Sequence, residues 1–391
     1  MLRFLDAGES HGKCLLGIIE GFPEGIVLNE DIIDYELRRR QGGYGRGDRM
    51  NIEQDRIQVL SGIILGMTIG SPIGLMIQNN DYQKFTHHDH EVLTIPRPGH
   101  ADLAGVLKFG LENYRPILER ASARNTAMRV AIGSIARQLL EYFSIHTYSY
   151  VVRIGGVSIQ DRNIRFHKGR EIYIKEIKTK INQSPVYCLD LEASNRMCKE
   201  IDQAKKDGDS LGGIFEVVVH NVPIGLGSHV FWDRRMDTRI SGAMMSIPSV
   251  KAIEFGKGIQ SSKYRGSLVQ DEIYYYSDKN VDNKVNYYRK KNWAGGIEGG
   301  ITNGEDIIIR VYVKPIPTIL QSLPSVNLKT KEEVKASYQR SDICIVPAAS
   351  VVGEAVANWE VASAFLEKFG GDSIGEIESN YKHYLERLKK C

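Results

Sequence analysis

The segment 123–143 limits most strongly what this chain can fold into. Five apolar residues recur there three or four positions apart: Met128, Ile132, Ile135, Leu139 and Phe143. That spacing puts them on one face of a helix. Ser122 stands where an N-cap would, because its hydroxyl can accept a hydrogen bond from the first helical turn. The pattern predicts a helix from about Ala123 to Phe143 with one buried face.

Other periodic segments surround this helix. Asn29 is a plausible N-cap for a helix with acids in its first turn and Arg38–Arg40 in its last. Further helices are predicted near 192–206, 351–367 and 373–390, and strands at Leu2–Leu5, Leu15–Ile19, Gly213–His220 and Asp306–Val313. Helices and strands are interleaved without the regular βαβ order of a doubly wound sheet, so the composition of elements favours an α+β fold. Polar, lysine-rich stretches near 160–185 and 260–291 are predicted to be surface insertions.

Charge and cysteine content exclude several classes of protein. The formal net charge is +3 and the pI about 8.4, too mild to imply nucleic acid or a membrane as partner. The chain has five cysteines and no Cys-x-x-Cys pair, which favours reduced thiols over a disulfide framework or a zinc site. We find neither a signal peptide nor a run of 18 apolar residues, so we expect a cytoplasmic protein.

An arginine-rich segment follows the first predicted helix at 38–50. Its five arginines accompany a single acid, Asp48, and its glycines allow a ligand to approach the backbone closely. Guanidinium groups bind phosphate or carboxylate oxygens in bidentate fashion, so the segment suits an anionic ligand. Two alternatives stay open from these residues alone, a solvated loop after a helix and an RNA contact.

Two histidines stand in turns rich in glycine or proline. His11 lies in Gly8–Gly12 between two predicted strands, and His100 lies in Pro96–Asp102, where prolines fix the backbone. Histidine is readily tuned to give or take a proton near neutral pH. The run Thr86–His90 also carries histidines, but its adjacent residues do not share one face of a helix or strand. We therefore expect no metal site there.

Further clusters recur along the chain. Arg120, Arg124 and Arg129 lie at the start of the 123–143 helix, where arginine opposes the helix dipole; an anion between them would offset this cost. A glycine-rich loop covers 292–304, and the rigid turn Lys314–Thr318 follows the strand after it. Arg340-Ser341-Asp342 precedes an apolar stretch at 343–352.

In this order the clusters resemble the chorismate synthase family. Three signatures agree: Gly8–Gly12, Glu119–Arg124, and Arg340-Ser341-Asp342 leading to Gly353-Glu354-Ala355. The segments Gly45–Met50, Pro96–Asp102 and Gly295–Gly304 are also similar to family motifs, and the match spans about positions 2 to 360. The resemblance implies an α+β fold, a β-α-β sandwich of this family's type, with 1–391 as one domain and a homotetramer as the assembly.

The resemblance also implies the reaction. These enzymes convert 5-enolpyruvylshikimate 3-phosphate to chorismate by a 1,4-elimination of phosphate, a carbon–oxygen lyase reaction and the last common step of the shikimate pathway to aromatic amino acids. They require reduced FMN (FMNH2) although no net redox change occurs. NADPH is a candidate reductant for that flavin, and an external reductase is the alternative.

Residue roles follow from the same resemblance. His11 corresponds to the histidine that protonates the departing phosphate, His100 to the one beside the flavin, and Asp342 to an acid that accepts a proton relayed through the flavin. The expected substrate contacts are Ser10, Arg40, Arg46, Arg124 and Arg340. The expected FMN contacts are Arg40, Arg46, Arg120, Ala121, Ser122, Pro248, Ser249, Gly299, Lys314, Pro315, Ile316, Pro317, Thr318 and Arg340.

Two other functions compete on the residues alone. A histidine-based phosphatase would use His11 as a nucleophile, although the usual Arg-His-Gly signature is missing. An RNA-binding protein would use the 38–49 stripe, with affinity that falls steeply as salt rises. Neither would need a flavin.

Overall fold

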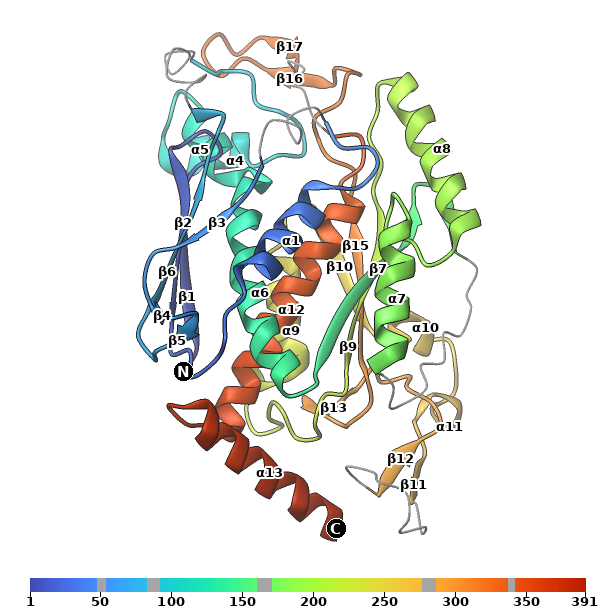
Figure 1. The fold of residues 1–391 in the computed structure, drawn as a ribbon. Coiled ribbons are helices and arrows are strands. Elements are labelled where there is room, and N and C mark those ends of the chain that lie inside the picture. The colour runs from blue at the N-terminus through green and yellow to red at the C-terminus, as the bar shows by residue number, and fades with distance from the viewer. Residues whose placement is uncertain (48–53, 83–91, 160–170, 276–285, 337–341) are drawn as a thin grey trace.

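Two antiparallel sheets enclose a layer of helices (Figure 1). The computed structural model describes residues 1–47, 54–82, 92–159, 171–275, 286–336 and 342–391, and of 171–173 only the backbone. One large hydrophobic core runs through the three layers, with a small satellite cluster of Val106, Tyr114 and Leu118. The predicted α+β sandwich is confirmed.

The first sheet has the strand order β1–β2–β6–β3. Its strands are β1 (Arg3–Ala7), β2 (Cys14–Glu20), β6 (Ile73–Gln78) and β3 (Ile57–Val59). Burial alternates along β2, so Leu15 and Ile19 face the helices while Leu16 and Ile18 remain exposed. This period of two places one apolar row against the core.

The second sheet has the order β10–β15–β9–β7–β8. Its strands are β10 (Val250–Phe255), β15 (Ile307–Val313), β9 (Gly213–His220), β7 (His146–Ile154) and β8 (Val157–Ser158). The runs of β-branched residues that predicted β9 and β15 form neighbouring strands, with Val219 opposite Ile307. Most of β7 and β9 is buried on both faces, because helices cover both sides.

The middle layer contains α1 (Glu30–Gln41), α6 (Thr126–Tyr142), α9 (Met236–Met245) and α12 (Val346–Phe369). Asn29 caps α1 as predicted, since its side chain accepts from the amide of Asp31 at 2.9 Å. Nearly all of α12 is buried, as expected for an apolar helix between a helix and a sheet. No helix in the described part of the chain is both long and apolar enough to cross a membrane.

Glycines let these layers approach closely. A Cβ built on Gly133 of α6 would lie 2.3 Å from the carbonyl oxygen of Ala355 in α12. A Cβ on Gly353 of α12 would lie 2.6 Å from the ring of Phe215 in β9. Neither position has room for a side chain, so glycine fixes the spacing between α6, α12 and the second sheet.

The remaining elements cover the edges and ends. They are β4 (Ile63–Ile64), β5 (Met67–Thr68), α4 (Asp102–Phe109), α5 (Arg115–Ala121), the 3-10 turn η1 (Ala123–Asn125), α7 (Glu171–Gln183), α8 (Leu191–Asp207), the 3-10 turn η2 (Trp232–Arg234), α10 (Gly258–Ser261), α11 (Gly266–Val269), β11 (Ile273–Tyr275), β12 (Tyr287–Arg289), β13 (Ile297–Glu298), β14 (Ile301–Thr302), β16 (Pro324–Val326), β17 (Glu333–Lys335) and α13 (Ile374–Lys390).

Two expectations from the sequence need correction. The helix predicted from Ala123 begins at Thr126, because Ser122 caps the 3-10 turn η1 instead of α6. The segment 160–185 is not wholly a surface insertion. Within it α7 buries Ile174, Ile177 and Ile181 in the main core, and their spacing of three and four gives that helix an apolar face.

Candidate active site

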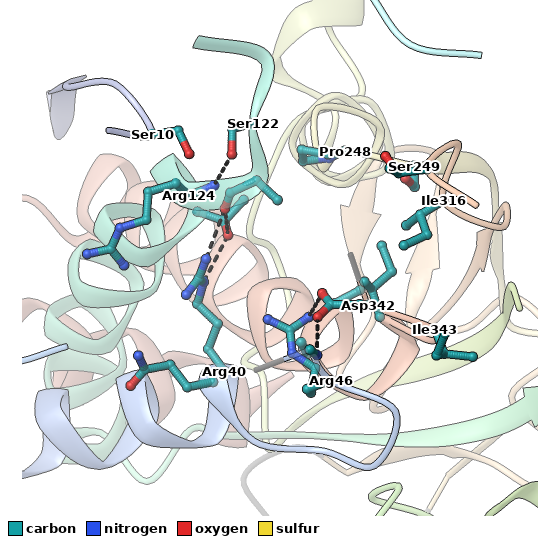
Figure 2. Close-up of a pocket in the computed structure, with 18 of the residues that line it drawn as sticks. Ser10, Arg40, Arg46, Ser122, Arg124, Pro248, Ser249, Ile316, Asp342 and Ile343 are labelled. Atoms are coloured by element: carbon teal, nitrogen blue, oxygen red, sulfur yellow. Dashed lines mark hydrogen bonds and ion pairs between the residues drawn. The ribbon is translucent and has the colours of Figure 1, made fainter. Parts of the chain in front are cut away.

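A cavity of about 2050 Å³ opens at the end of the sandwich near α4 and α5. Its walls come from segments far apart in the sequence: the loop after β1, the end of α1, the turn before α4, the α5–α6 junction, the loop before β10, the turn after β15 and the start of α12. Figure 2 shows Ser10, Ser122 and Arg124 across an open space from Pro248, Ser249 and Ile316.

Most residues predicted for the site line this cavity. They are Ser10, His11, Arg40, Arg46, His100, Ala121, Ser122, Arg124, Pro248, Ser249, Lys314, Ile316, Pro317, Thr318 and Asp342. The fold therefore brings the expected proton donors, arginines and flavin contacts to one place.

A buried carboxylate holds two of the cavity's arginines side by side. Asp55 accepts from Nη1 of Arg124 at 2.6 and 2.8 Å and forms an ion pair with Arg40 at 3.5 Å. Burial lowers the pKa of Arg40 to about 10; Asp55 opposes this effect and the charge of Arg124 adds to it. The trio has a net positive charge at the wall of the cavity, which suits a phosphate.

Arg40 and Arg124 are also fixed by neutral partners. Nε of Arg40 donates to the hydroxyl of Thr126 at 2.9 Å, and its Nη2 donates to the carbonyl of Ala123 at 2.9 Å. Nε of Arg124 donates to Oδ1 of Asn79 at 2.8 Å. Guanidinium groups held in this way keep their orientation before a ligand arrives, which lowers the entropy cost of binding.

Arg46 pairs with the predicted acid Asp342. Its Nη1 donates to Oδ2 of Asp342 at 2.6 Å, and the amide of Gly47 donates to Oδ1 at 2.7 Å (Figure 2). These hydrogen bonds join the loop after α1 to the segment before α12, and both segments line the cavity. Arg39 is likewise paired, with Glu354 at 2.7 Å. Arg39, Arg40 and Arg46 thus contact carboxylates of the chain instead of forming the exposed stripe that an RNA contact would need.

Both histidines of the cavity contact a carboxylate through Nδ1. His11 lies 2.9 Å from Oε1 of Glu119, and His100 lies 2.5 Å from Oδ1 of Asp102. Arg97 also donates to Asp102, from Nε at 2.8 Å. Burial would raise the pKa of Asp102, but the hydrogen bonds with His100 and Arg97 outweigh it and lower that pKa well below its usual range. A carboxylate on Nδ1 orients each ring.

The opposite wall fits a flavin. Apolar side chains of Ile247, Pro248 and Ile316 line the cavity together with the hydroxyls of Ser249 and Thr318, and Ser122 lies across the open space from Pro248 and Ser249. The Lys314 amine donates to the carbonyl of Gly99 at 2.7 Å and joins this wall to the turn that holds His100. A flat ring system with a polar edge and a phosphate tail needs this combination of apolar surface, hydroxyls and cations.

Three predicted contacts are not among the residues that line the cavity, and a fourth is outside the described part of the chain. Arg120 pairs with Asp6 at 2.6 Å and is exposed outside it. Gly299 lies exposed in the turn between β13 and β14, toward the other end of the molecule in Figure 1. Pro315 is not among the lining residues, although its neighbours Lys314 and Ile316 are. Arg340 lies outside the described residues, as do Asp48, Arg49 and the histidines at 87–90.

Sequence reasoning missed the acids that organise the site. Asp102 lies within the Pro96–Asp102 motif quoted for His100, so the acid in that motif was an available signal. Glu119 begins a separate motif, Glu119–Arg124, 108 positions from His11, and nothing local connected the two. Asp55 had no such local signal, because its arginine partners are 15 and 69 positions away. An anion was expected between the arginines near the start of α6. The chain itself supplies one negative charge there, because Asp55 pairs with Arg124.

Comparison with known proteins gives one consistent result. The family model "Chorismate synthase" matches residues 2–366. The chain is 50% identical to the chorismate synthase of Desulforamulus reducens over 399 aligned residues, with all of both chains covered. It is 49% identical to that of Desulforudis audaxviator, covering all of this chain and 98% of the relative. A crystal structure of a chorismate synthase superposes with a TM-score of 0.81 at 40% identity and covers 100% of this chain and 99% of the other.

Proposed function

Because the chain belongs to the chorismate synthase family, we propose that its arginine-lined cavity is where 5-enolpyruvylshikimate 3-phosphate loses phosphate to give chorismate. The family's activity is that of a carbon–oxygen lyase in the shikimate pathway. The observation that carries the assignment of this cavity is the Arg40–Asp55–Arg124 trio at a wall that it shares with His11.

The trio and His11 would act at the phosphate end of the substrate. As the carbon–oxygen bond breaks, negative charge grows on the leaving phosphate, and fixed guanidinium groups stabilise it without having to reorient. When the His11 ring is protonated on both nitrogens, Nε2 can give its proton to a phosphate oxygen while Nδ1 donates to Glu119. Ser10 lies beside His11 and would contact the same end.

The apolar wall would hold the cofactor. Ala121, Ser122, Pro248, Ser249 and the Lys314–Thr318 turn are the residues that we assign to reduced FMN, supported by the mixture of apolar side chains, hydroxyls and a cation described above. When bound, a reduced flavin supplies electron density to the electron-poor carbon framework and takes up the second hydrogen.

Two further side chains can hold protons in the cavity. Asp102 and Arg97 orient His100, whose Nε2 is the nitrogen not engaged by Asp102. The Asp342 carboxylate lines the cavity and is oriented by Arg46 and the amide of Gly47, and we assign it the role of proton acceptor. We assign Arg46 and Arg340 to contacts with substrate or nucleotide.

Several finer statements belong to the same proposal. We assign Arg120, Pro315 and Gly299 to FMN contacts on the resemblance alone. A homotetramer is supported by apolar residues exposed on the outer face of the first sheet, Leu5, Leu16 and Ile18. One domain over 1–391 is supported by the single large core. A cytoplasmic location is supported by five unpaired cysteines. NADPH is the reductant to test.

The test is turnover of 5-enolpyruvylshikimate 3-phosphate under anaerobic conditions. FMN is reduced once by light, at a stoichiometric ratio to protein, and phosphate and chorismate are measured together. Elimination conserves the electron count, so we expect many chorismates per reduced flavin and none with oxidised FMN. Phosphate release without chorismate would favour the phosphatase instead. Turnover with and without NADPH, using flavin that has been left oxidised, then identifies the reductant.

A further inference from the structure

We propose that Glu119 is a positioning residue for His11, holding both the ring and the backbone of that histidine so that Nε2 is presented to the cavity. The inference builds on the proposed function, in which His11 protonates the leaving phosphate. In this proposal Glu119 acts through His11 and does not itself contact the substrate.

The contacts between the two residues are unusually complete. Nδ1 of His11 lies 2.9 Å from Oε1 and 3.1 Å from Oε2 of Glu119, and the backbone amide of His11 donates to Oε2 at 2.9 Å. The amide of Ser10 donates to the backbone carbonyl of Glu119 at 3.0 Å. One residue of α5 therefore sets the position of two consecutive residues in the loop between β1 and β2.

Both partners are themselves anchored. Glu119 lies in the last turn of α5, whose neighbouring side chains Tyr114 and Leu118 form the buried satellite cluster. On the other side of the loop, the Asn79 amide donates to the carbonyls of Glu9 at 3.2 Å and Gly12 at 2.7 Å. The His11 loop is thus clamped from α5 and from the end of β6, and the ring has little freedom to turn.

This geometry sets the proton as well as the position. A carboxylate that accepts from Nδ1–H holds a proton on that nitrogen, so the proton that His11 can transfer is the one on Nε2 of the doubly protonated ring. Burial would raise the pKa of Glu119, but its contacts with His11 outweigh burial and lower that pKa, so Glu119 is ionised at neutral pH.

Other charged groups surround the pair. Arg115 of α5 lies 3.8 Å from Oε1 of Glu119, and Arg124 lines the same cavity. Glu9 and Lys13 flank His11 in its loop and are exposed. Of these groups, Glu119 is the one that the structure places in hydrogen-bond contact with the His11 ring.

The experiment compares Glu119→Gln with the unaltered protein by NMR of 13C-labelled histidine side chains, without substrate or flavin. His11→Ala identifies the His11 signal among the ten histidines. Glu119 accepts from both the backbone amide and Nδ1 of His11, and a glutamine side chain has only one acceptor oxygen for these two groups. The preference for a proton on Nδ1 should therefore weaken. Glu119→Asp keeps both carboxylate oxygens and should restore part of that preference.

Kinetics then connect this contact with turnover. Glu119→Gln should lower kcat about 10–100-fold, the loss typical when a group that orients a histidine is removed, with KM changed less than about threefold. The double variant with His11→Ala should be no slower than His11→Ala alone, because Glu119 acts through that ring. The matched control is Glu112→Gln, an exposed glutamate just before α5, which should leave both readouts unchanged.

Two results would overturn the inference. One is a His11 signal whose tautomer is the same in Glu119→Gln as in the unaltered protein. The other is a double variant whose losses multiply, which would mean that Glu119 acts independently of His11. Failure of the proposed function looks different: His11→Ala would keep full kcat while the His11 tautomer in the protein that retains this histidine still depends on Glu119. That result would remove the acid role of His11 and leave the hold of Glu119 on the ring.

Discussion

At the scale of single residues, the cavity is organised by pairing cations with carboxylates that the chain itself supplies. Asp55 forms ion pairs with Arg40 and Arg124. Asp342 pairs with Arg46, and Asp102 pairs with His100. An unpaired buried guanidinium is costly, so such partners are needed before a ligand arrives. Because Asp55 balances only one of its two arginines, the trio keeps a net positive charge for a phosphate.

Arg46 offers a first test of this arrangement. A hydrogen bond to a charged group contributes about 1.5–3 kcal/mol, so Arg46→Ala should weaken binding of substrate or FMN at least tenfold. The side-chain partner of Asp342 is lost as well, so kcat should fall with it. Equilibrium binding and steady-state kinetics measure the two effects. Kinetics and binding equal to those of the unaltered protein, with unfolding unchanged, would restore the solvated-loop interpretation of this segment.

The two histidines should separate in their effects. His11→Ala should lose roughly 10²–10⁴-fold in turnover, the usual range for a general acid, while flavin affinity barely changes. His100→Ala should instead alter the absorption spectrum of bound reduced FMN, because the Lys314 contact places its turn against the wall that we assign to the flavin. If both variants change the flavin spectrum equally, the division of roles is wrong.

At the scale of elements, the position of the cavity wall depends on how closely α6 and α12 pack. Arg124 comes just before α6, Thr126 is its first residue, and both line the cavity. From α12, the lining residues are Ala348, Ala349 and Val352. Gly133 sets the separation of the two helices, since a Cβ there would lie 2.3 Å from a backbone oxygen that cannot move aside easily.

Gly133→Ala should therefore destabilise the protein although alanine is the better helix former. We expect a loss of about 1–3 kcal/mol or more in the free energy of unfolding, from overpacking, together with weaker substrate binding as the helices separate. The matched control is Gly242→Ala in α9, where a Cβ would meet nothing within 4 Å. That change should leave the free energy of unfolding unchanged or raise it by up to about 1 kcal/mol. Urea unfolding measures both, and equal effects would contradict the role given to Gly133.

At the scale of the whole molecule, an ion-pair network joins three helices under the cavity. Arg39 and Glu36 of α1 connect to Arg137 and Glu141 of α6, while Arg39 also reaches Glu354 of α12. Glu354 in turn accepts from the amide and hydroxyl of Ser149 in β7, at 3.0 and 2.7 Å. The network ties the helix layer to the second sheet.

This network predicts a pH dependence of stability. Burial would raise the pKa of Glu141, but the nearby His146, whose Nδ1 lies 3.9 Å from Oε1, and the charges of Arg137 and Lys178 outweigh it and hold that pKa at about 2. A carboxyl whose folded pKa is depressed stabilises the protein fully above its unfolded pKa of about 4.3, and the contribution disappears as pH falls toward the folded value.

We therefore expect the free energy of unfolding of Glu141→Gln at pH 7 to be about 2–3 kcal/mol below that of the unaltered protein. As pH falls from 5 to 2, the stability of this variant should decrease less than that of the unaltered protein. Urea titrations at several pH values measure this. Glu386→Gln, at an exposed position of α13, is the control and should follow the unaltered protein. Parallel curves for all three proteins would show that the Glu141 pairs do not contribute to acid stability.

Much of the fold and part of the site could be predicted from the sequence, because those features depend on neighbours along the chain. The run Gly213–His220 is a strand with the predicted ends, and Asn29 caps α1 as expected. These outcomes follow from local propensity and capping. The motifs also identified His11, His100, Arg124 and Asp342, which the fold brings to one cavity.

Only the tertiary structure determined which charged side chains form ion pairs with one another. Asp55 reaches Arg124 across 69 positions, and Glu354 reaches Arg39 across 315. The same applies to Gly299 and Arg120, which belong to the expected motifs and yet lie outside the cavity of this chain. Pairing energy depends on distance in space and on burial, whereas the sequence specifies only separation along the chain. The chemistry of the residues was therefore readable from the sequence, and their partners only from the fold.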